Sequence, residues 1–205
     1  MDVVTEIHVA DTAALQRAAR IIAEGGVVAF PTDTVYGLGC DLFNTRAVER
    51  IYAIKGRPAR MPLIAMFGLP EQWALVADEL PERARTLMAR WWPGPLTLIA
   101  PARPEVPARV LGGGTTIGMR MPDHPAALAL FYLVARPLAT TSANRSGAPP
   151  ACSAEEVYAQ LHGEIELILD AGASPHGQAS TVLDCITDPP TILRPGPLTL
   201  EELGM

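Results

Sequence analysis

Short apolar runs closed by glycine or proline alternate with longer amphipathic segments along this chain. Residues 27–30 form one such run, closed by Pro31, and are predicted to be a buried strand. The segment before it, residues 13–23, carries apolar side chains at helical spacing and is ended by Gly25-Gly26. A helix and a strand in direct succession favour an α/β architecture.

The same signals continue to the end of the chain. Asp11 or Thr12 can cap the first helix, and Asn44 or Thr45 can cap a second, which stops before Gly56. Further helices are predicted over residues 71–77, 82–92, 125–135 and 155–161. Further strands are predicted over residues 63–67, 96–100, 116–121, 137–141, 165–169, 181–186 and 191–193.

Strands alternate with helices early and cluster late. This order predicts a twisted, mixed β-sheet with helices against it rather than a purely parallel fold. The chain has 205 residues without an internal repeat or a low-complexity linker, so we expect one domain over residues 1–205. The proline-rich segment 101–107 is interpreted as a surface loop.

Charge and cysteine content disfavour several classes of protein. The formal net charge is −6 and no run of Lys or Arg occurs, which argues against a dedicated nucleic-acid binder. The three cysteines are far apart and no Cys-x-x-Cys pair exists, so neither a disulfide framework nor a zinc site is indicated. No signal peptide and no apolar run of about 20 residues is visible. We therefore expect a soluble, cytoplasmic protein without a membrane segment.

Five polar groups sit at strand ends or in turns, where binding sites are usually built. They are residues 32–39, 55–58, 115–120, 140–147, and 180–181 together with 194–196. Taken singly, each has an ordinary explanation, because threonine, serine, asparagine and glycine all form turns. Lys55 is the only lysine of the chain, which suggests that its position requires a compact ammonium rather than a planar guanidinium.

Together, these groups suit a small, anionic substrate. Arg57, Arg120 and Arg194 offer guanidinium groups to phosphate or carboxylate, and Lys55 adds a point charge. Hydroxyl groups that can orient a polar substrate are those of Thr34, Thr116, Thr140, Ser142 and Ser180. No Ser-His-Asp set, Walker A motif or His-x-x-x-His pair is visible. Such a site favours catalysis by positioning and charge neutralisation, as in phosphoryl or nucleotidyl transfer.

Seven motifs in sequence resemble the signature of the YrdC/Sua5 family of L-threonylcarbamoyladenylate synthases. They are PTDTVYGLG at 31–39, KGRP at 55–58, PGPLT at 93–97, RMP at 120–122, TSAN at 141–144, STV at 180–182 and RPG at 194–196. The resemblance implies an open, twisted α/β sheet with a deep, positively lined cavity. Because the chain ends soon after residue 196, it resembles the short, single-domain members of the family.

The resemblance also implies roles for individual residues. The threonine-binding residues would be Thr34, Met66, Arg120, Thr140 and Ser180. The ATP-binding residues would be Lys55, Arg57, Met61, Thr116, Ser142, Asn144, Pro150 and Arg194, with Lys55 and Arg57 as the catalytic pair and no resident metal. Three positions depart from the family pattern: Met61 replaces a common asparagine, Met66 a common histidine and Pro150 a common serine.

The implied reaction joins L-threonine, bicarbonate or CO2, and ATP, with Mg²⁺ on the nucleotide, into threonylcarbamoyl-AMP and pyrophosphate. A partner transferase system would then modify adenosine 37 of tRNA, and weak binding of tRNA itself is a further expectation. Two alternatives stay open. One is a module of this fold that binds double-stranded RNA in a basic groove, which the net charge of −6 disfavours. The other is a paralogue that transfers a different carbamoyl group.

Overall fold

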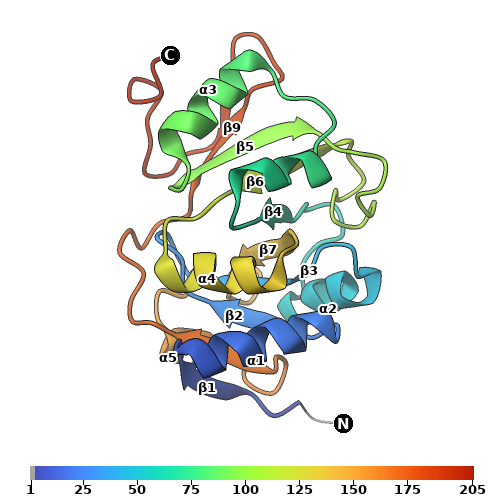
Figure 1. Ribbon diagram of the computed structural model, residues 1–205, viewed down its shortest axis with the longest axis vertical. Coiled ribbons are helices and arrows are strands. Elements are labelled where there is room, and N and C mark those ends of the chain that lie inside the picture. The colour runs from blue at the N-terminus through green and yellow to red at the C-terminus, as the bar shows by residue number, and fades with distance from the viewer. Residues whose placement is uncertain (1–2) are drawn as a thin grey trace.

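Ten strands form one mixed sheet within residues 3–205, the part of the chain that the computed structural model describes (Figure 1). The strands are β1 (Glu6–Val9), β2 (Val28–Phe30), β3 (Gly37–Asp41), β4 (Ile64–Met66), β5 (Leu96–Pro101), β6 (Thr116–Arg120), β7 (Leu138–Ser142), β8 (Leu167–Asp170), β9 (Thr181–Asp184) and β10 (Thr191–Arg194). Their order in the sheet is β1-β8-β2-β3-β7-β4-β6-β5-β9-β10.

Parallel and antiparallel pairs occur side by side in this sheet. The pairs β1–β8, β2–β8, β4–β6 and β5–β9 are parallel. The pairs β2–β3, β3–β7, β4–β7, β5–β6 and β9–β10 are antiparallel. The predicted mixed, open sheet with flanking helices is therefore confirmed.

The five α-helices begin and end within one residue of the predicted bounds. They are α1 (Thr12–Ala23), α2 (Thr45–Lys55), α3 (Glu82–Trp91), α4 (Pro125–Val134) and α5 (Ala154–Leu161). Asp11 caps α1 through its side chain, which accepts from the N–H of Ala14 at 2.8 Å, and Asn44 caps α2 in the same way. Gly56 ends α2 in the left-handed conformation, with φ of 59°.

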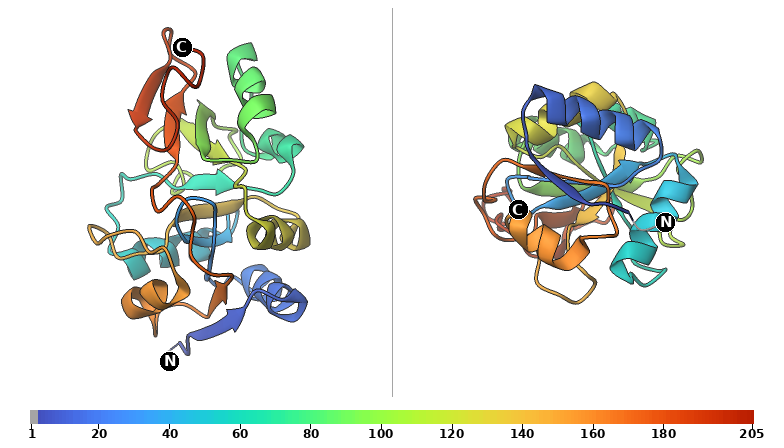
Figure 2. Two further views of the ribbon diagram at one scale, coloured as in Figure 1. Left: turned by 90° about the vertical axis from the view of Figure 1, so that its left-hand side faces the viewer. Right: turned by 90° about the horizontal axis from the view of Figure 1, so that it is seen from below.

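Alternate residues of one segment show how the sheet separates two hydrophobic cores. Val28 and Phe30 face the cluster that contains α1 and α4, whereas Val27 and Ala29 face the cluster that contains α2 and α5. Figure 2 shows α1 and α4 on one side of the sheet and α2 and α5 on the other. Both faces of these strands are covered, so the segment reads as a continuous apolar run.

Three elements differ from the sequence prediction. β3 was not predicted, because residues 32–39 were placed among the polar groups at strand ends or in turns. A Cβ atom at Gly37 would lie 2.8 Å from the ring of Phe30, so packing against that ring requires glycine in this strand. β1 is a short edge strand with no predicted counterpart. The predicted helix 71–77 is a 3₁₀ helix, η1 (Pro70–Leu75).

None of the helices found between residues 3 and 205 is both long enough and apolar enough to cross a membrane.

Candidate active site

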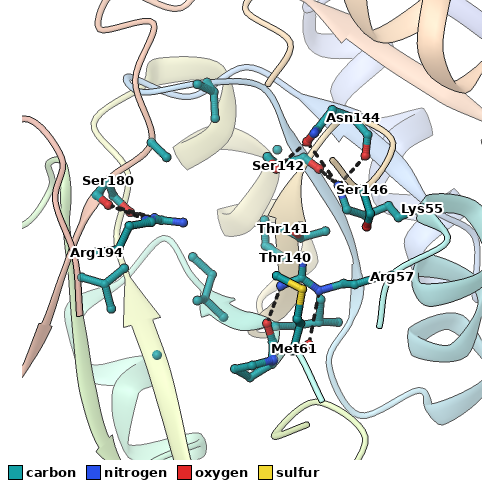
Figure 3. A pocket seen from close by; sticks show the side chains of 18 of the residues that line it. Lys55, Arg57, Met61, Thr140, Thr141, Ser142, Asn144, Ser146, Ser180 and Arg194 are labelled. Carbon is teal, nitrogen blue, oxygen red and sulfur yellow. Dashed lines mark hydrogen bonds between the residues drawn. The ribbon is translucent and has the colours of Figure 1, made fainter. Parts of the chain in front are cut away.

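A cavity of about 920 Å³ lies against the central strands, between the end of α2 and the β9–β10 pair (Figure 3). Its lining includes Lys55 and the arginines Arg57, Arg60, Arg120 and Arg194, and no aspartate or glutamate. The other predicted site residues in its wall are Thr34, Met61, Met66, Thr140, Ser142, Asn144 and Ser180. Eleven of the thirteen predicted site residues therefore meet in one cavity.

The pairing register of the strands explains why residues so far apart in sequence share this wall. Met66 on β4 pairs with Arg120 on β6, and Ile64 pairs with both Gly118 on β6 and Thr140 on β7. Directly paired residues point to the same face of a sheet, so these side chains form adjacent rows.

Arg120 is held in place at the buried end of the cavity. Its side chain is 2% exposed, and its Nη2 forms an ion pair of 2.5 Å with Oδ1 of Asp33. Nη1 donates to Thr34 Oγ1 at 2.7 Å and Nε donates to the carbonyl of Gly94 at 2.9 Å. Burial lowers the pKa of Arg120 to about 10, and the Asp33 carboxylate opposes this shift. The guanidinium therefore stays charged at neutral pH.

Lys55, at the C-terminal end of α2, is bonded to the turn that follows β7. Its Nζ donates to the carbonyl oxygens of Ser142 and Asn144, each at 2.5 Å, and lies 3.2 Å from Asn144 Oδ1. Ser142 Oγ donates to the same Oδ1 at 2.5 Å. Burial, aided by the charge of Arg57, lowers the pKa of Lys55 to about 7. The lysine thus lines the cavity, but its N–H groups are used in hydrogen bonds to the turn.

Arg57 and Arg194 lie on opposite sides of the cavity (Figure 3). Arg57 donates to the carbonyls of Met61 and Pro62, at 3.2 and 2.8 Å, and so shapes the loop after α2. Arg194 donates to the carbonyl and the hydroxyl of Ser180, at 2.8 and 3.0 Å from Nη2. Burial lowers the pKa of both arginines, and the charge of Arg57 adds to the shift of Arg194. An anion between them would relieve this repulsion.

Two predicted ATP-binding residues do not line the cavity. Thr116 is exposed at the start of β6, where it pairs with Pro101, and Pro150 is exposed in the segment before α5. Two further residues belong to this site without having been given a role from the sequence: Arg60 lines the cavity, and Asp33 pairs with Arg120. Asp33 lies between two threonines in a turn, and Arg60 follows Arg57 at a spacing of three residues. Both signals are visible in the sequence but common in ordinary turns.

The cavity offers no carboxylate to a metal ion, and no group of three or more His, Cys, Asp or Glu residues suited to a metal is found among residues 3–205. A divalent cation bound to a nucleotide here would depend on phosphate oxygens and water for its ligands. The cavity's lining instead suits anions, through guanidinium groups, and small polar ligands, through hydroxyl groups.

The fold and the cavity define a member of the Sua5/YciO/YrdC family, to which this chain belongs. The family's model, described as "Telomere recombination", matches residues 20–196. The chain is 49% identical to threonylcarbamoyl-AMP synthase of Pyrococcus abyssi, over 91% of this chain and 55% of that protein. It is 47% identical to threonylcarbamoyl-AMP synthase of Bacillus subtilis, over 99% of this chain and 59% of that protein.

The fold is also similar to the crystal structure of P. abyssi Sua5 complexed with L-threonine. The TM-score is 0.93 at 45% identity, and the alignment covers 99% of this chain and 60% of the other. This chain thus spans less than two thirds of the length of these relatives.

Proposed function

We propose that the protein is an L-threonylcarbamoyladenylate synthase that joins L-threonine, bicarbonate or CO2, and ATP into threonylcarbamoyl-AMP and pyrophosphate. The observation that supports this most strongly is the cavity, which gathers four arginines, one lysine and several hydroxyl groups without any carboxylate. A triphosphate and an amino acid need this combination, because both bring negative charge into a confined site. The two threonylcarbamoyl-AMP synthases at 47–49% identity support the same activity.

In the proposed reaction, the threonine amine first captures CO2 and forms N-carboxy-threonine, releasing one proton. The new carboxylate then attacks the α-phosphorus of ATP, a P–O bond forms, and pyrophosphate leaves with the electrons of the broken P–O bond. Both reactants are anionic, so the barrier is largely electrostatic. Arg57 and Arg194 would neutralise the phosphates from opposite sides, and no protein nucleophile is required.

We propose that the cavity holds two adjoining subsites, which meet where Arg194 donates to Ser180. We propose that the amino acid occupies the end formed by Thr34, Met66, Arg120, Thr140 and Ser180. The nucleotide would occupy the end formed by Lys55, Arg57, Met61, Ser142, Asn144 and Arg194. Thr116 and Pro150, which lie outside the cavity lining, would reach the nucleotide only if the loops around them closed on it.

Further elements of the proposal concern the setting of the reaction. Mg²⁺ would enter with ATP, bound to its phosphates. The product would pass to a transferase system that modifies adenosine 37 of tRNA in the cytoplasm, with weak direct contact to tRNA at most. The three cysteines, Cys40, Cys152 and Cys185, are free thiols, which fits a reducing compartment.

The decisive experiment measures pyrophosphate release and the AMP adduct from ATP and bicarbonate with each amino acid in turn. We expect turnover that depends on threonine. Turnover with carbamoyl phosphate and ATP but not with threonine would instead identify a carbamoyl-transfer paralogue. A gel shift with double-stranded RNA at physiological salt, together with an absence of turnover, would identify an RNA-binding module.

A further inference from the structure

Asp33 joins three segments that surround the amino-acid end of the cavity. Its Oδ1 accepts hydrogen bonds from Nη2 of Arg120 at 2.5 Å and from the backbone N–H of Asp123 at 3.1 Å. Its backbone carbonyl accepts from the N–H of His176 at 3.0 Å, in the segment that leads to Ser180. The side chain of Asp33 is 5% exposed and is not part of the cavity wall. Asp33 can therefore act on a ligand only through its neighbours.

The contacts of Arg120 determine which of its N–H groups remain for a ligand. A guanidinium carries five N–H groups. Three of them are used by Gly94, Thr34 and Asp33, which leaves two, one on each Nη nitrogen. Two N–H groups match the two oxygens of a carboxylate. Without Asp33, one of the three contacts that fix the guanidinium plane would be lost.

We propose that Asp33 is a positioning residue for the amino-acid subsite, because its Oδ1 fixes the guanidinium of Arg120 in the direction that receives the substrate carboxylate. This inference rests on the proposed function and adds to it a residue that does not touch the substrate.

The unequal use of the two carboxylate oxygens permits a sharp test. Oδ1 takes both donors, whereas Oδ2 is buried and has no hydrogen-bond partner among residues 3–205. Asp33→Asn can keep its oxygen at Oδ1 and retain both hydrogen bonds while losing the charge. Asp33→Ala loses both bonds, and Asp33→Glu keeps the charge but displaces the oxygen. The three variants thus separate the acceptor from the charge.

A matched control exists elsewhere in the fold. Glu166 likewise accepts from an arginine and from a backbone N–H: Arg50 Nη1 at 2.7 Å and Val27 N at 3.0 Å. Glu166 does not line the cavity. Glu166→Ala and Glu166→Gln should lower the melting temperature without changing the KM for threonine, so they show what the loss of a structural carboxylate does by itself.

The measurements are the KM for threonine, the Kd for a non-hydrolysable ATP analogue, and the melting temperature of each variant. A misdirected guanidinium should raise the threonine KM of Asp33→Ala and Asp33→Glu about tenfold to 100-fold. The Kd for the ATP analogue should stay near that of the wild type, and Asp33→Asn should recover most of the threonine affinity. If Asp33→Ala does not fold, the threonine KM of Asp33→Glu is compared with that of Asp33→Asn, and this comparison tests the inference.

Three results would overturn the inference: an unchanged threonine KM in Asp33→Glu, an equal loss of threonine and nucleotide binding, or an Asp33→Asn protein as impaired as Asp33→Glu. A wild-type protein without threonine-dependent pyrophosphate release contradicts the proposed function instead. An active wild type with unaffected Asp33 variants contradicts only the positioning role.

Discussion

Lys55 and Asn144 are joined twice: Nζ of the lysine lies 2.5 Å from the carbonyl oxygen of Asn144 and 3.2 Å from its Oδ1. With the carbonyl of Ser142 as a third acceptor, the three N–H groups of the ammonium are all engaged. The link fastens the end of α2 to the turn after β7. Lys55 lines the cavity, and a phosphate could accept a hydrogen bond from its Nζ by displacing one of these three oxygens.

The titration of Lys55 can be observed directly because the chain has no other lysine. In protein labelled with ¹³C-lysine, we expect the single side-chain signal to titrate with a midpoint near 7, below the ordinary 10.5, because burial lowers the pKa of this group. Arg57→Ala should raise the midpoint, since the charge of Arg57 contributes to the shift. A midpoint above about 9.5 would show that the three oxygen acceptors outweigh desolvation.

The same shift predicts how stability depends on pH. The folded pKa of Lys55, about 7, lies below the unfolded value of 10.5, so the unfolded chain binds more protons between these pH values. The buried ammonium thus destabilises the fold fully below pH 7, and the penalty is lifted as pH rises toward 10.5. We expect the unfolding free energy of the wild type, relative to Lys55→Met, to increase between about pH 7 and pH 10. Urea titrations measure this; a constant or falling difference contradicts it.

Arg57 is expected to be essential for turnover. Its guanidinium lies in the cavity wall with no carboxylate to neutralise it, and removing such a charge should lower the rate of pyrophosphate release by about 100-fold or more. We expect the same for Lys55→Ala, through loss of the turn that holds Ser142 and Asn144. Arg46→Ala, which removes an exposed arginine of α2 outside this cavity, is the matched control. Near-normal turnover of Arg57→Ala would refute its assignment.

Helices and strands could be predicted from the sequence wherever a strong local signal, such as a capping residue or a continuous apolar run, was present. The caps at Asp11 and Asn44 and the continuous apolar run at 27–30 each have one strong local cause. β3 could not be predicted, because its glycines are required by the ring of Phe30, which arrives from another strand. A contact between two strands cannot be predicted from the residues of one strand alone.

The sequence predicted most of the residues that line the cavity, but it did not predict the hydrogen bonds between them. Motif positions indicated which side chains gather, and the strand register brings them together. The pairing of Arg120 with Asp33 depends on folding a segment 87 residues away onto the same end of the sheet, which no spacing rule reveals. The bonds of Lys55 to Ser142 and Asn144 were not predicted either, because they join the end of α2 to a turn almost 90 residues further along the chain, and its role toward the triphosphate stays a prediction.

The cysteines are expected to be unreactive and dispensable for chemistry. Burial raises the pKa of all three thiols, Cys40, Cys152 and Cys185, and the pKa of Cys185 reaches about 11. Thiols are therefore protonated at neutral pH, and none of the three lines the cavity. We expect a protein with all three changed to alanine or serine to keep its turnover, measured as pyrophosphate release with threonine. A folded triple variant without activity would show that a thiol takes part.

Selectivity among amino acids tests the amino-acid subsite most directly. The two free N–H groups of Arg120 can hold a carboxylate, and the hydroxyls of Thr34, Thr140 and Ser180 can bond the substrate's amine or hydroxyl. Met66 offers an apolar surface in the same wall. Serine lacks only a methyl group, worth about 1–3 kcal/mol, so it should be a poor but detectable substrate.

Valine should be rejected far more strongly than serine, because a methyl group in place of the hydroxyl leaves buried polar partners unsatisfied. We therefore expect adenylate formation in the order threonine, serine, valine, measured as kcat/KM for each at saturating ATP and bicarbonate. Arg120→Ala should lose threonine use while retaining affinity for an ATP analogue, because Arg120 belongs to the proposed amino-acid subsite and not to the proposed nucleotide subsite. Equal use of valine and threonine, or unchanged threonine affinity in Arg120→Ala, would place the amino acid elsewhere.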